Sequence, residues 1–489
     1  MDHQISIKLI PHISIEEPRI SRGFAPTNVF RVPLDGDLSS SIVIGKKALD
    51  DATNFSIIEP APKALEAPPA ESVGNLYRIS KTTAIPLQGP FSRRRIDGSY
   101  LWIDIENGRL VVLGDCQDEM MSNLCQGASP SSISDTHGVN SLIGLLAVAG
   151  FIRGIRGHVD KTIVDAKRFL RIHLTERCNL SCVHCYADSG PNVKTNGELP
   201  PQRWIELLSE FAQLGGERVL FTGGEALAYS GCDQLLRHSK QLGLHVTLFT
   251  NGILVPKFKD AIRESVDEVQ VSIDGANPSS NDPIRGSGSF DKAVRAIDLL
   301  AELGVPVRVS TVAMKDNWDD IQQNYLTLVA RWKNLPVTFK INYGVMTHGR
   351  GEELKDELDI NKTRPIIDSM MASIYPTDAA RIVRSTSGCG YAEQIVVAPN
   401  GEIHPCHLLS GAIANLGQDT MGQVLNTLKE VQAEYSVDES VGCKTCDIRH
   451  LCGGTCRVEN AKRTNNLRVT YCDAEEKLRK LVALKRTFT

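Results

Sequence analysis

The stretch RFLRIHLTERCNLSCVHC, residues 168–185, is the point at which the sequence begins to repeat a strand followed by a helix. Strands are predicted at 168–175, 217–222, 244–250, 267–273, 306–313 and 337–343, and helices at 201–214, 232–242, 256–264, 289–303 and 318–332. This alternation is typical of parallel sheet covered by helices. The sequence therefore predicts an α/β fold, a partial (β/α)6 barrel, with ligands at the carboxyl ends of its strands.

Three cysteines follow the first predicted strand in the spacing CxxxCxxC: Cys178, Cys182 and Cys185. Three thiolates on one loop can hold three irons of a cubane cluster and leave the fourth iron without a protein ligand. A zinc site is the alternative, but structural zinc normally has four ligands. The spacing therefore favours an iron–sulfur cluster with one iron open to a ligand.

This loop resembles that of the radical S-adenosylmethionine (SAM) superfamily. The resemblance implies that the three cysteines hold a catalytic [4Fe-4S] cluster whose open iron binds the amino and carboxylate groups of SAM. It also implies that His184 lies against the adenine. Thr222-Gly223-Gly224-Glu225, after the second predicted strand, matches the GGE motif that holds the methionine amino group. Glycine permits close backbone approach to a ligand, and Glu225 can pair with an ammonium.

Other SAM contacts rest on shorter matches. Ser272 and Asp274, at the end of the fourth predicted strand, fall where the family contacts the ribose, and Asn251 ends the third strand. Asn-Gly and Asp-Gly pairs also favour turns, so a role in turn formation is the alternative. Arg350 is expected either to meet the SAM carboxylate or to cap a loop.

A second cysteine group occupies the C-terminal region. In order, its residues are Cys389, Gly401, Cys406, Cys443, Cys446, Cys452, Cys456 and Cys472. Seven cysteines exceed the four of one site, which implies at least two metal centres. The pattern resembles the SPASM domain, an extension of radical SAM enzymes that binds two auxiliary [4Fe-4S] clusters. A pair of zinc ribbons is the alternative.

The SPASM resemblance assigns the ligands of both auxiliary clusters. It gives the outer cluster Cys443, Cys446, Cys452 and Cys472, and the inner cluster Cys389, Cys406 and Cys456. The fourth iron of the inner cluster then lacks a cysteine ligand from this set, and its ligand is expected to be His404, His407, Cys232 or a substrate atom. The cysteines outside both groups are interpreted as small buried apolar residues: Cys116, Cys125 and Cys232.

The part before the barrel predicts a smaller module. The segment Ile57–Pro69 is rich in proline and alanine and is interpreted as an extended linker. YLWIDIENGRLVVL, residues 100–113, predicts a β-hairpin with an Asn-Gly turn. Helices are predicted at Asp118–Cys125 and Asn140–Ala149, and Phe151–Ile155 is a candidate wing strand. This is the plan of a winged-helix module.

Four regions follow from these patterns: 1–75 unassigned, 76–157 winged-helix-like, 158–385 the partial barrel and 386–489 the irregular cluster-binding SPASM domain. Net charge −4 gives no general attraction to nucleic acid, and no apolar run approaches the ~20 residues of a membrane span. The start of the chain lacks the features of a signal peptide. Ten of the thirteen cysteines fall in two groups whose spacings are too tight for a secreted disulfide framework. We therefore expect a cytoplasmic protein with neither nucleic acid nor membrane as a partner.

The winged-helix module resembles the elements that capture leader peptides, which bind as an added strand. Together with the SPASM pattern it predicts a peptide maturase that forms a thioether or carbon–carbon cross-link, or another oxidative modification. Its partners are a ribosomally made precursor peptide and a one-electron reductant such as flavodoxin or ferredoxin. The alternatives are an enzyme of the sulfatase-maturing type, an enzyme acting on a small molecule or tetrapyrrole, and a redox-sensing DNA-binding regulator. The regulator is disfavoured because residues 140–149 lack basic side chains.

Overall fold

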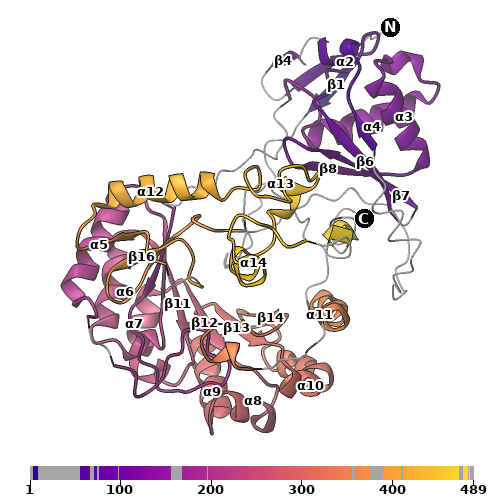
Figure 1. Cartoon of the computed structure of the whole chain (residues 1–489). Helices are drawn as coiled ribbons and strands as arrows, with labels where there is room; N and C mark the ends of the chain where they lie inside the picture. The colour runs from indigo at the N-terminus through magenta and orange to yellow at the C-terminus, as the bar shows by residue number, and fades with distance from the viewer. Residues whose placement is uncertain are drawn as a thin grey trace. The chain divides into compact units, whose positions relative to one another are not determined.

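The computed structural model describes most of the chain, and the ranges are 4–8, 56–66, 71–73, 76–96, 98–155, 168–194, 197–346, 348–354, 358, 360–374, 389–408, 411–472, 477–478, 480–482 and 484. The chain divides into two compact units (Figure 1). The first comprises Met1–Ile163, Ala379–Cys389 and Ala433–Thr489, and the second comprises Val164–Asp378 and Gly390–Gln432. The region predicted as one domain from 386 onward is therefore shared between both units.

The second unit is built on a nine-stranded sheet with the order β14-β13-β12-β11-β10-β9-β15-β16-β17. Its strands are β9 (Phe169–His173), β10 (Arg218–Thr222), β11 (His245–Thr250), β12 (Glu268–Ser272), β13 (Val307–Val312), β14 (Val337–Asn342), β15 (Ile395–Val397), β16 (Glu402–His404) and β17 (Ala414–Asn415). Each neighbouring pair from β9 to β14 is parallel. The predicted run of six parallel strands is confirmed.

The other three strands correct the expectation that the chain beyond 386 is irregular. β15 adds to β9 in parallel, and β16 and β17 follow as antiparallel neighbours. These strands have only two or three residues each, too few for a periodic pattern to be visible in the sequence. The segment around Cys406 is thereby attached to the sheet beside β9, the strand that leads into the first cysteine group.

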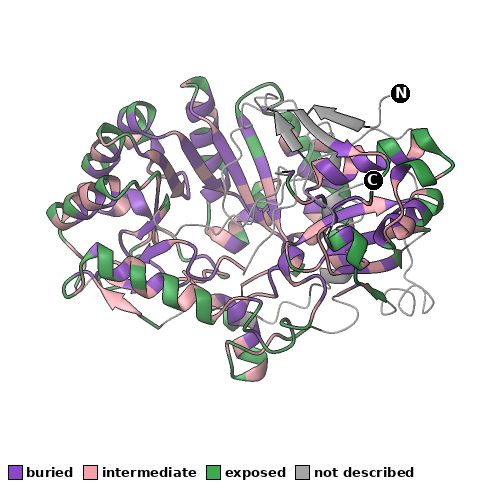
Figure 2. Cartoon of the chain, turned by 90° about the horizontal axis from the view of Figure 1, so that it is seen from above, coloured by how far each residue is buried: buried purple, intermediate pink, exposed green. Residues whose placement is uncertain are grey.

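Helices cover one face of this sheet, as Figure 1 shows for α5, α6, α7 and α9. Their bounds are α5 (Pro201–Gln213), α6 (Cys232–Gln241), α7 (Val255–Ser265), α8 (Pro278–Arg285), α9 (Ser289–Glu302), α10 (Trp318–Ala330), α11 (Ile360–Ile374) and α12 (Met421–Glu434). The apolar stripe of α5 buries Trp204, Leu207 and Phe211. In Figure 2 the strands are largely buried, while the outer sides of these helices are exposed. The five predicted helices are present; α8, α11 and α12 were not predicted.

The first unit contains two small sheets. One has the order β1-β5-β4, with β1 (Gln4–Lys8), β4 (Glu71–Val73) and β5 (Leu76–Ser80); the other has the order β3-β6-β7-β8, with β3 (Ser56–Ile58), β6 (Phe91–Ile96), β7 (Ser99–Asp104) and β8 (Arg109–Leu113). Its helices are α2 (Pro62–Glu66), α3 (Asp115–Cys125), α4 (Thr136–Val148), α13 (Arg449–Cys452) and α14 (Arg457–Thr464). The segments near the N-terminus and beyond residue 433 thus belong to one unit.

The predicted hairpin is present as β7 and β8. Tyr100 pairs with Leu113 and Asp104 with Arg109, while Asn107 N–H donates to the Asp104 carboxylate at 3.0 Å within the turn. Gly108 has a φ of 61°, a left-handed conformation that glycine adopts without strain. The two predicted helices are also present as α3 and α4, each beginning a few residues earlier than expected.

Two expectations for this module are wrong. Phe151–Ile155 does not form a wing strand; only Ile152 makes an isolated bridge, to Leu87. The segment Ile57–Pro69 is not an extended linker over its described part, because it holds the end of β3 and the helix α2. Ala64 is fully buried, and Ala61 N–H donates to the Cys125 carbonyl at 2.7 Å. Tertiary packing therefore overrides the linker-like composition.

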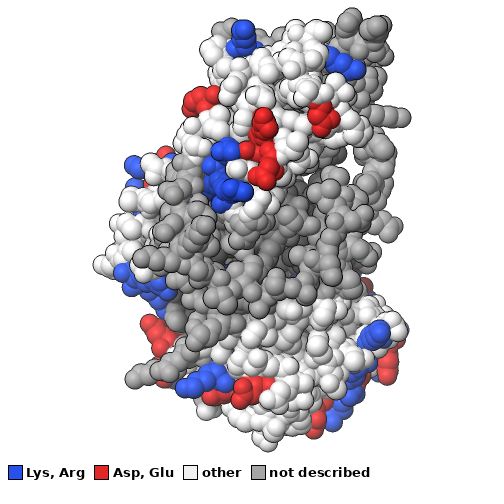
Figure 3. Space-filling model, turned by 90° about the vertical axis from the view of Figure 1, so that its right-hand side faces the viewer, with Lys and Arg blue, Asp and Glu red and all other residues white. Residues whose placement is uncertain are grey.

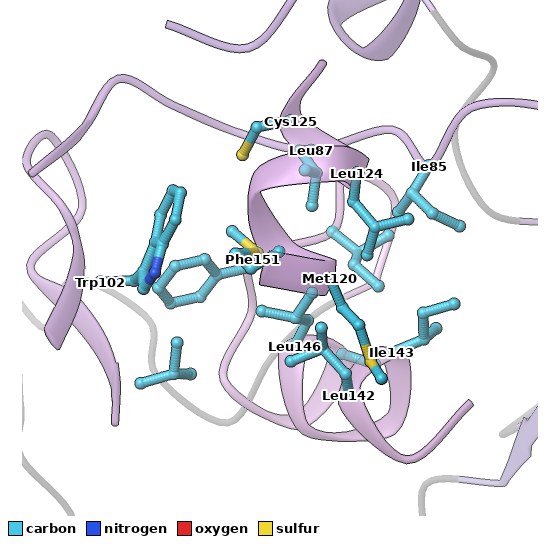
Figure 4. Close-up of a cluster of buried hydrophobic side chains, with 14 of the residues drawn as sticks. Ile85, Leu87, Trp102, Met120, Leu124, Cys125, Leu142, Ile143, Leu146 and Phe151 are labelled. Carbon is cyan, nitrogen blue, oxygen red and sulfur yellow. The ribbon is translucent and has the colours of Figure 1, made fainter. Parts of the chain in front are cut away.

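The hairpin sheet is buried on both faces. On one face Trp102 and Phe151 pack with apolar side chains of α3 and α4, as Figure 4 shows. On the other face Leu101, Ile103 and Leu110 pack with Ile448, Leu451, Leu481 and Leu484. Alternate residues of β7 thus serve two cores. The second core joins the hairpin to the segment that carries Cys446 and Cys452.

Two features of the described residues relate to the expectation of neither nucleic acid nor membrane as a partner: the surface charges and the length and polarity of the helices. Acidic and basic side chains lie interspersed on the described part of the face in Figure 3. Among the described residues, none of the helices combines the length and apolar character needed to cross a membrane.

Candidate functional site

The residues predicted to bind SAM lie at one end of the sheet of the second unit. The cysteine loop follows β9, the GGE motif follows β10, Asn251 follows β11 and Asp274 comes two residues after β12. The carboxyl ends of parallel strands meet at the same edge of a sheet. The parallel pairing of β9 to β12 therefore brings these four segments together.

The three cysteine thiols of the loop are free and partly or fully buried. Leu180 N–H approaches Cys178 Sγ at 3.4 Å, and Asn251 Nδ2 approaches the same sulfur at 3.7 Å while donating to Asn179 at 2.6 Å. Burial raises the pKa of Cys178 to about 11, and the Cys182 and Cys185 thiols add to the shift. The three sulfurs therefore lie within electrostatic reach of one another.

This donor set fits an iron–sulfur cluster. Over the described ranges, no group of three or more His, Cys, Asp or Glu side chains converges on one point as the ligands of a single metal ion do. Each cysteine of a cubane binds a different iron, so the sulfurs of a cluster site need not converge. N–H groups directed at a sulfur are also the kind of contact that tunes a cluster.

Arg350 holds the cysteine loop in place. Its Nε donates to the Cys182 carbonyl at 3.0 Å, its Nη2 to the Ser189 carbonyl at 2.7 Å, and its Nη1 pairs with Asp188 at 2.7 Å. Arg350 N–H also donates to the Cys185 carbonyl at 3.0 Å. The geometry thus matches the loop-capping alternative, because all three guanidinium nitrogens contact the loop.

The two glycines of the GGE motif lie against the backbone that precedes the cysteines. Gly224 N–H donates to the Thr175 carbonyl at 2.8 Å, and Glu225 N–H donates to the Arg177 carbonyl at 2.9 Å. A Cβ on Gly223 would lie 2.4 Å from the Thr175 carbonyl oxygen, and one on Gly224 would lie 2.3 Å from that of Arg177. The sequence analysis gave the glycines a role toward the ligand; the structure adds close contact with the cysteine loop.

We expect Gly224→Ala to destabilise the second unit by roughly 1–3 kcal/mol, because the new methyl group meets backbone that is itself hydrogen-bonded. Iron binding by the first cysteine group should fall in parallel. Denaturant unfolding and an iron assay measure both effects. Gly422→Ala in α12 is the control, because its Cβ would meet only Thr420 Oγ1, at 3.9 Å. Equal effects of the two substitutions would contradict the steric explanation.

Glu225 is almost completely buried, and its carboxylate already accepts several hydrogen bonds from the protein. Its carboxylate accepts from Thr250 Oγ1 at 2.8 Å, Asn251 N–H at 2.8 Å and Leu227 N–H at 3.2 Å. Burial raises the pKa of Glu225, and these donors oppose the shift. Glu225 thus ties the end of β11 to the GGE segment, in addition to its predicted role toward an ammonium.

Asp274 is the centre of a buried ion cluster that includes His184. Asp274 Oδ2 lies 2.7 Å from Arg285 Nη1 and 3.2 Å from His184 Nε2, and Oδ1 accepts from Val312 N–H at 2.8 Å. Burial alone would raise the pKa of Asp274, but His184 and Arg285 hold it well below its ordinary range. His184 is therefore positioned by Asp274, and its Nδ1 has no hydrogen-bond partner.

Arg285 is a site residue that the sequence analysis missed. It ends α8, an eight-residue helix that contains Pro283 and was not predicted. Its carbonyl lies 3.9 Å from Cys182 Sγ, and its buried guanidinium opposes the raised pKa of that thiol. The available signal was the buried carboxylate of Asp274 in the predicted strand end, which requires a cation nearby.

A cavity of about 280 Å³ opens beside the GGE motif. Its lining includes Gly223, Gly224, Thr175 and Ser189 together with Tyr186 of the cysteine loop. β16 and the turn after it also contribute lining residues, namely His404, Cys406 and His407. Thr222 lies in register with His173, another lining residue. Ser272 ends β12, half-buried, in register with Ser310.

The structure brings together part of the second cysteine group in the first unit. Cys443, Cys446 and Cys452 interact electrostatically with one another, and burial raises the pKa of Cys443 and of Cys452. Cys443 Sγ lies 3.1 Å from Thr470 Oγ1, two residues before Cys472. Cys389 and Cys456 belong to the first unit and Cys406 to the second. The ligand assignments of both auxiliary clusters remain predictions.

The cysteines outside both groups differ in burial. Cys125 and Cys232 are buried, as predicted for structural residues. Cys116 is exposed, so the prediction for it is wrong. Cys116 lies in the first turn of α3, before the helix residues whose side chains are buried, which begin at Asp118.

Comparison with known proteins identifies the central part of this arrangement. The sequence profile of the Radical SAM superfamily matches residues 172–328, from within β9 into α10. The chain contains a radical SAM domain. The match covers the cysteine loop, the GGE motif, Asn251, Ser272 and Asp274, and the domain belongs to an enzyme.

Three curated relatives match this chain over different lengths. GTP 3′,8-cyclase of Petrotoga mobilis is 33% identical over 176 residues, covering 35% of this chain and only 54% of that protein. AdoMet-dependent heme synthase of Methanosarcina barkeri is 27% identical over 331 residues, covering 60% of this chain and 92% of the relative. Mycofactocin maturase MftC of Mycolicibacterium smegmatis is 28% identical over 319 residues, covering 60% and 79%.

Two solved structures share the fold. Streptococcus suis SuiB bound to S-adenosylmethionine has a TM-score of 0.51 at 17% identity, covering 81% of this chain and 99% of SuiB. anSMEcpe with bound AdoMet has a TM-score of 0.52 at 18% identity, covering 65% of this chain and 97% of that protein. At these identities the similarity establishes the fold of the radical SAM domain and its surroundings, not the substrate.

Proposed function

We propose that this protein is a radical SAM enzyme that modifies a ribosomally made precursor peptide and carries two auxiliary [4Fe-4S] clusters. The observation that carries the proposal is the construction of the first unit. A hairpin sheet with β8 at its edge, among the described strands, shares a hydrophobic core with the segment of Cys446 and Cys452. The similarity to a peptide maturase beyond the barrel supports the same substrate class.

The edge of β8 is where we place the leader peptide. β8 pairs with β7 on one side, and α3 begins two residues after it. An unpaired strand edge offers backbone N–H and C=O groups to an extended peptide. Both faces of the sheet are occupied by the two cores, so backbone pairing at the edge would supply most of the affinity.

At the other site, a cluster on Cys178, Cys182 and Cys185 would supply the electron that splits SAM into methionine and a 5′-deoxyadenosyl radical. The chain positions the reactants: Arg350 fixes the loop, and Gly223 and Gly224 hold it close to β10. The peptide gives one hydrogen atom to the radical. Closing a cross-link would then release a proton to water and an electron to the auxiliary centres, so the peptide would lose two hydrogen atoms in all.

The test uses the reconstituted enzyme, SAM, a one-electron reductant such as flavodoxin or ferredoxin, and the peptide encoded beside the gene. We expect 5′-deoxyadenosine and a peptide lighter by two hydrogen atoms per cross-link, and slower amide exchange in residues 109–113 when the peptide is bound. Product formation from a tetrapyrrole, with none from the peptide, would favour the small-molecule alternative that the heme synthase similarity supports. It would refute the proposed substrate class.

A further inference from the structure

Arg171 is a buried cation without a hydrogen-bonded partner in the described part of the chain. It lies in β9 on the same side of the strand as His173, two residues later. Its exposed fraction is 8%, and its Nε has no hydrogen-bond partner. Burial lowers the pKa of Arg171, which is the sign of an uncompensated charge. The guanidinium carbon lies 6.0 Å from the centre of the Phe249 ring, a contact with a neutral group that leaves the positive charge without a counter-ion. A buried charge without a counter-ion is unfavourable, so this arrangement indicates a missing anion.

Arg171 is not itself a lining residue of the cavity beside the GGE motif, but it lies in register with Val396, which lines the cavity, and two residues before His173, which also does. It interacts electrostatically with Tyr186 and Cys406, and with His173 and His407, all four of which line that cavity. Lys340 in β14 adds to the field, because it interacts with both Arg171 and His407. Three lining ring nitrogens are buried without a partner: His173 Nε2, His404 Nδ1 and His407 Nδ1.

Acidic groups near this end of the sheet do not neutralise Arg171. Glu176 lines the cavity but is an exposed residue. Glu402 lies 3.7 Å from His404 Nε2, and Glu268 is paired with Arg308 at 2.8 Å. The cavity therefore combines a nearby positive charge with buried ring nitrogens that lack a hydrogen-bond partner.

We propose that this cavity binds a carboxylate of the peptide substrate, with Arg171 as its counter-charge and the lining histidines as hydrogen-bond donors. The inference rests on the proposed function, because it places a peptide group beside the GGE motif. About 280 Å³ equals roughly nine water molecules at ~30 Å³ each, enough for an acidic side chain or a C-terminal residue. The substrate class is thus a peptide with an Asp or Glu at the modified position, or one modified at its C-terminus.

Two other anions are alternative partners for the positive charge of Arg171. One is the carboxylate of SAM, because Gly223 and Gly224 line the cavity. The other is a cluster bound through Cys406, whose thiolates would carry negative charge. Each predicts a different result in a binding experiment.

The experiment measures binding of small carboxylate probes to the reconstituted full chain by equilibrium dialysis. N-acetyl-glutamate methylamide has only a side-chain carboxylate, N-acetyl-glutamine only a terminal one, and N-acetyl-glutamine methylamide has none. We expect one of the first two to bind and the third not to bind. Arg171→Met should weaken that binding at least about tenfold, and Arg171→Lys should weaken it less.

Arg308→Met is the matched control, because Arg308 is also buried but is paired with Glu268. It should lower the unfolding temperature and leave probe binding within about twofold, whereas Arg171→Met should leave the unfolding temperature unchanged or raised. Loss of probe binding in excess SAM would assign the site to SAM and overturn the proposal. Unchanged probe binding by Arg171→Met, together with a shifted cluster potential, would also overturn the proposal. Probe binding requires no turnover, so this test of the carboxylate site is independent of whether the enzyme cleaves SAM.

Discussion

Replacing Cys182 by alanine should reduce 5′-deoxyadenosine formation to background. Cys182 is a buried thiol held between the Arg350 side chain, which contacts its carbonyl, and the Arg285 backbone, which its sulfur approaches. Without this thiolate the loop can hold only two irons, and a cubane on two protein ligands is not retained. Iron should fall from about twelve to about eight per chain, since each cubane contributes four. Chromatography of the SAM reaction and an iron assay give both values.

Cys232→Ala is the control for the loss of a buried thiol. Cys232 is fully buried in α6 and lies outside both cysteine groups. This variant should keep its iron and its SAM cleavage. Cleavage by Cys182→Ala at the wild-type rate would refute the assignment of the loop. About four irons in the wild type, with zinc present, would refute the auxiliary clusters alone.

The parallel strands were predictable because each is an apolar run followed by an amphipathic helix. Leu170 and Ile172 in β9 face the helices, while Arg171 and His173 face the other way, so the strand is buried on both sides. The cysteine loop and the GGE motif were found from their spacing. The parallel pairing of β9 with β10 explains why two segments over 40 residues apart reach the same site.

What the sequence did not reveal depends on contacts between distant segments. Arg350 was expected to meet either a ligand or a loop, and its contacts with the Cys182 and Ser189 carbonyls depend on where the folded chain places those groups. Arg171 looked like an ordinary strand residue, because its lack of a partner is a property of the folded chain. β15 pairs with the edge of β9, and β16 in turn pairs with β15, so neither strand is recognisable from its own short sequence.

The buried pair of Arg94 and Asp447 should give the largest loss of stability of any ion pair described here. Arg94 in β6 donates through Nε and Nη2 to the two Asp447 oxygens, each at 2.7 Å, and the side chains are 0% and 1% exposed. Ser92 Oγ and Lys477 Nζ also contact Asp447, at 2.6 and 2.8 Å. We expect Asp447→Asn to cost about 3–5 kcal/mol, because it leaves Arg94 buried without its counter-charge.

The pH dependence of this contribution has a defined sign. Burial alone would raise the pKa of Asp447, but Arg94 and Lys477 lower it from 3.8 to about 2. A lowered pKa means that the folded state favours the ionised carboxylate. Its stabilisation is therefore complete above about pH 4 and is lost as the pH falls toward 2. The asparagine variant should lack this loss between pH 4 and 2.

Amide exchange in β7 is the appropriate measurement, because it reports on the first unit alone. Asp115→Asn is the control: Asp115 also pairs with an arginine of β6, Arg95, at 3.6 Å in the same unit, but the two side chains are 76% and 59% exposed, so this pair should be worth less than ~1 kcal/mol. Equal effects of the two variants would contradict the importance of burial.

Asp447 directly follows Cys446, so the same substitution also tests whether the hairpin module supports a metal site. If Cys446 and its neighbours hold the outer cluster, loosening Asp447 should release about four irons per chain while SAM cleavage persists. The core formed by Leu101, Ile103, Ile448 and Leu451 would then couple the proposed peptide-binding sheet to that cluster. Faster exchange in β7 with all iron retained would mean instead that the pair supports only the fold of the first unit.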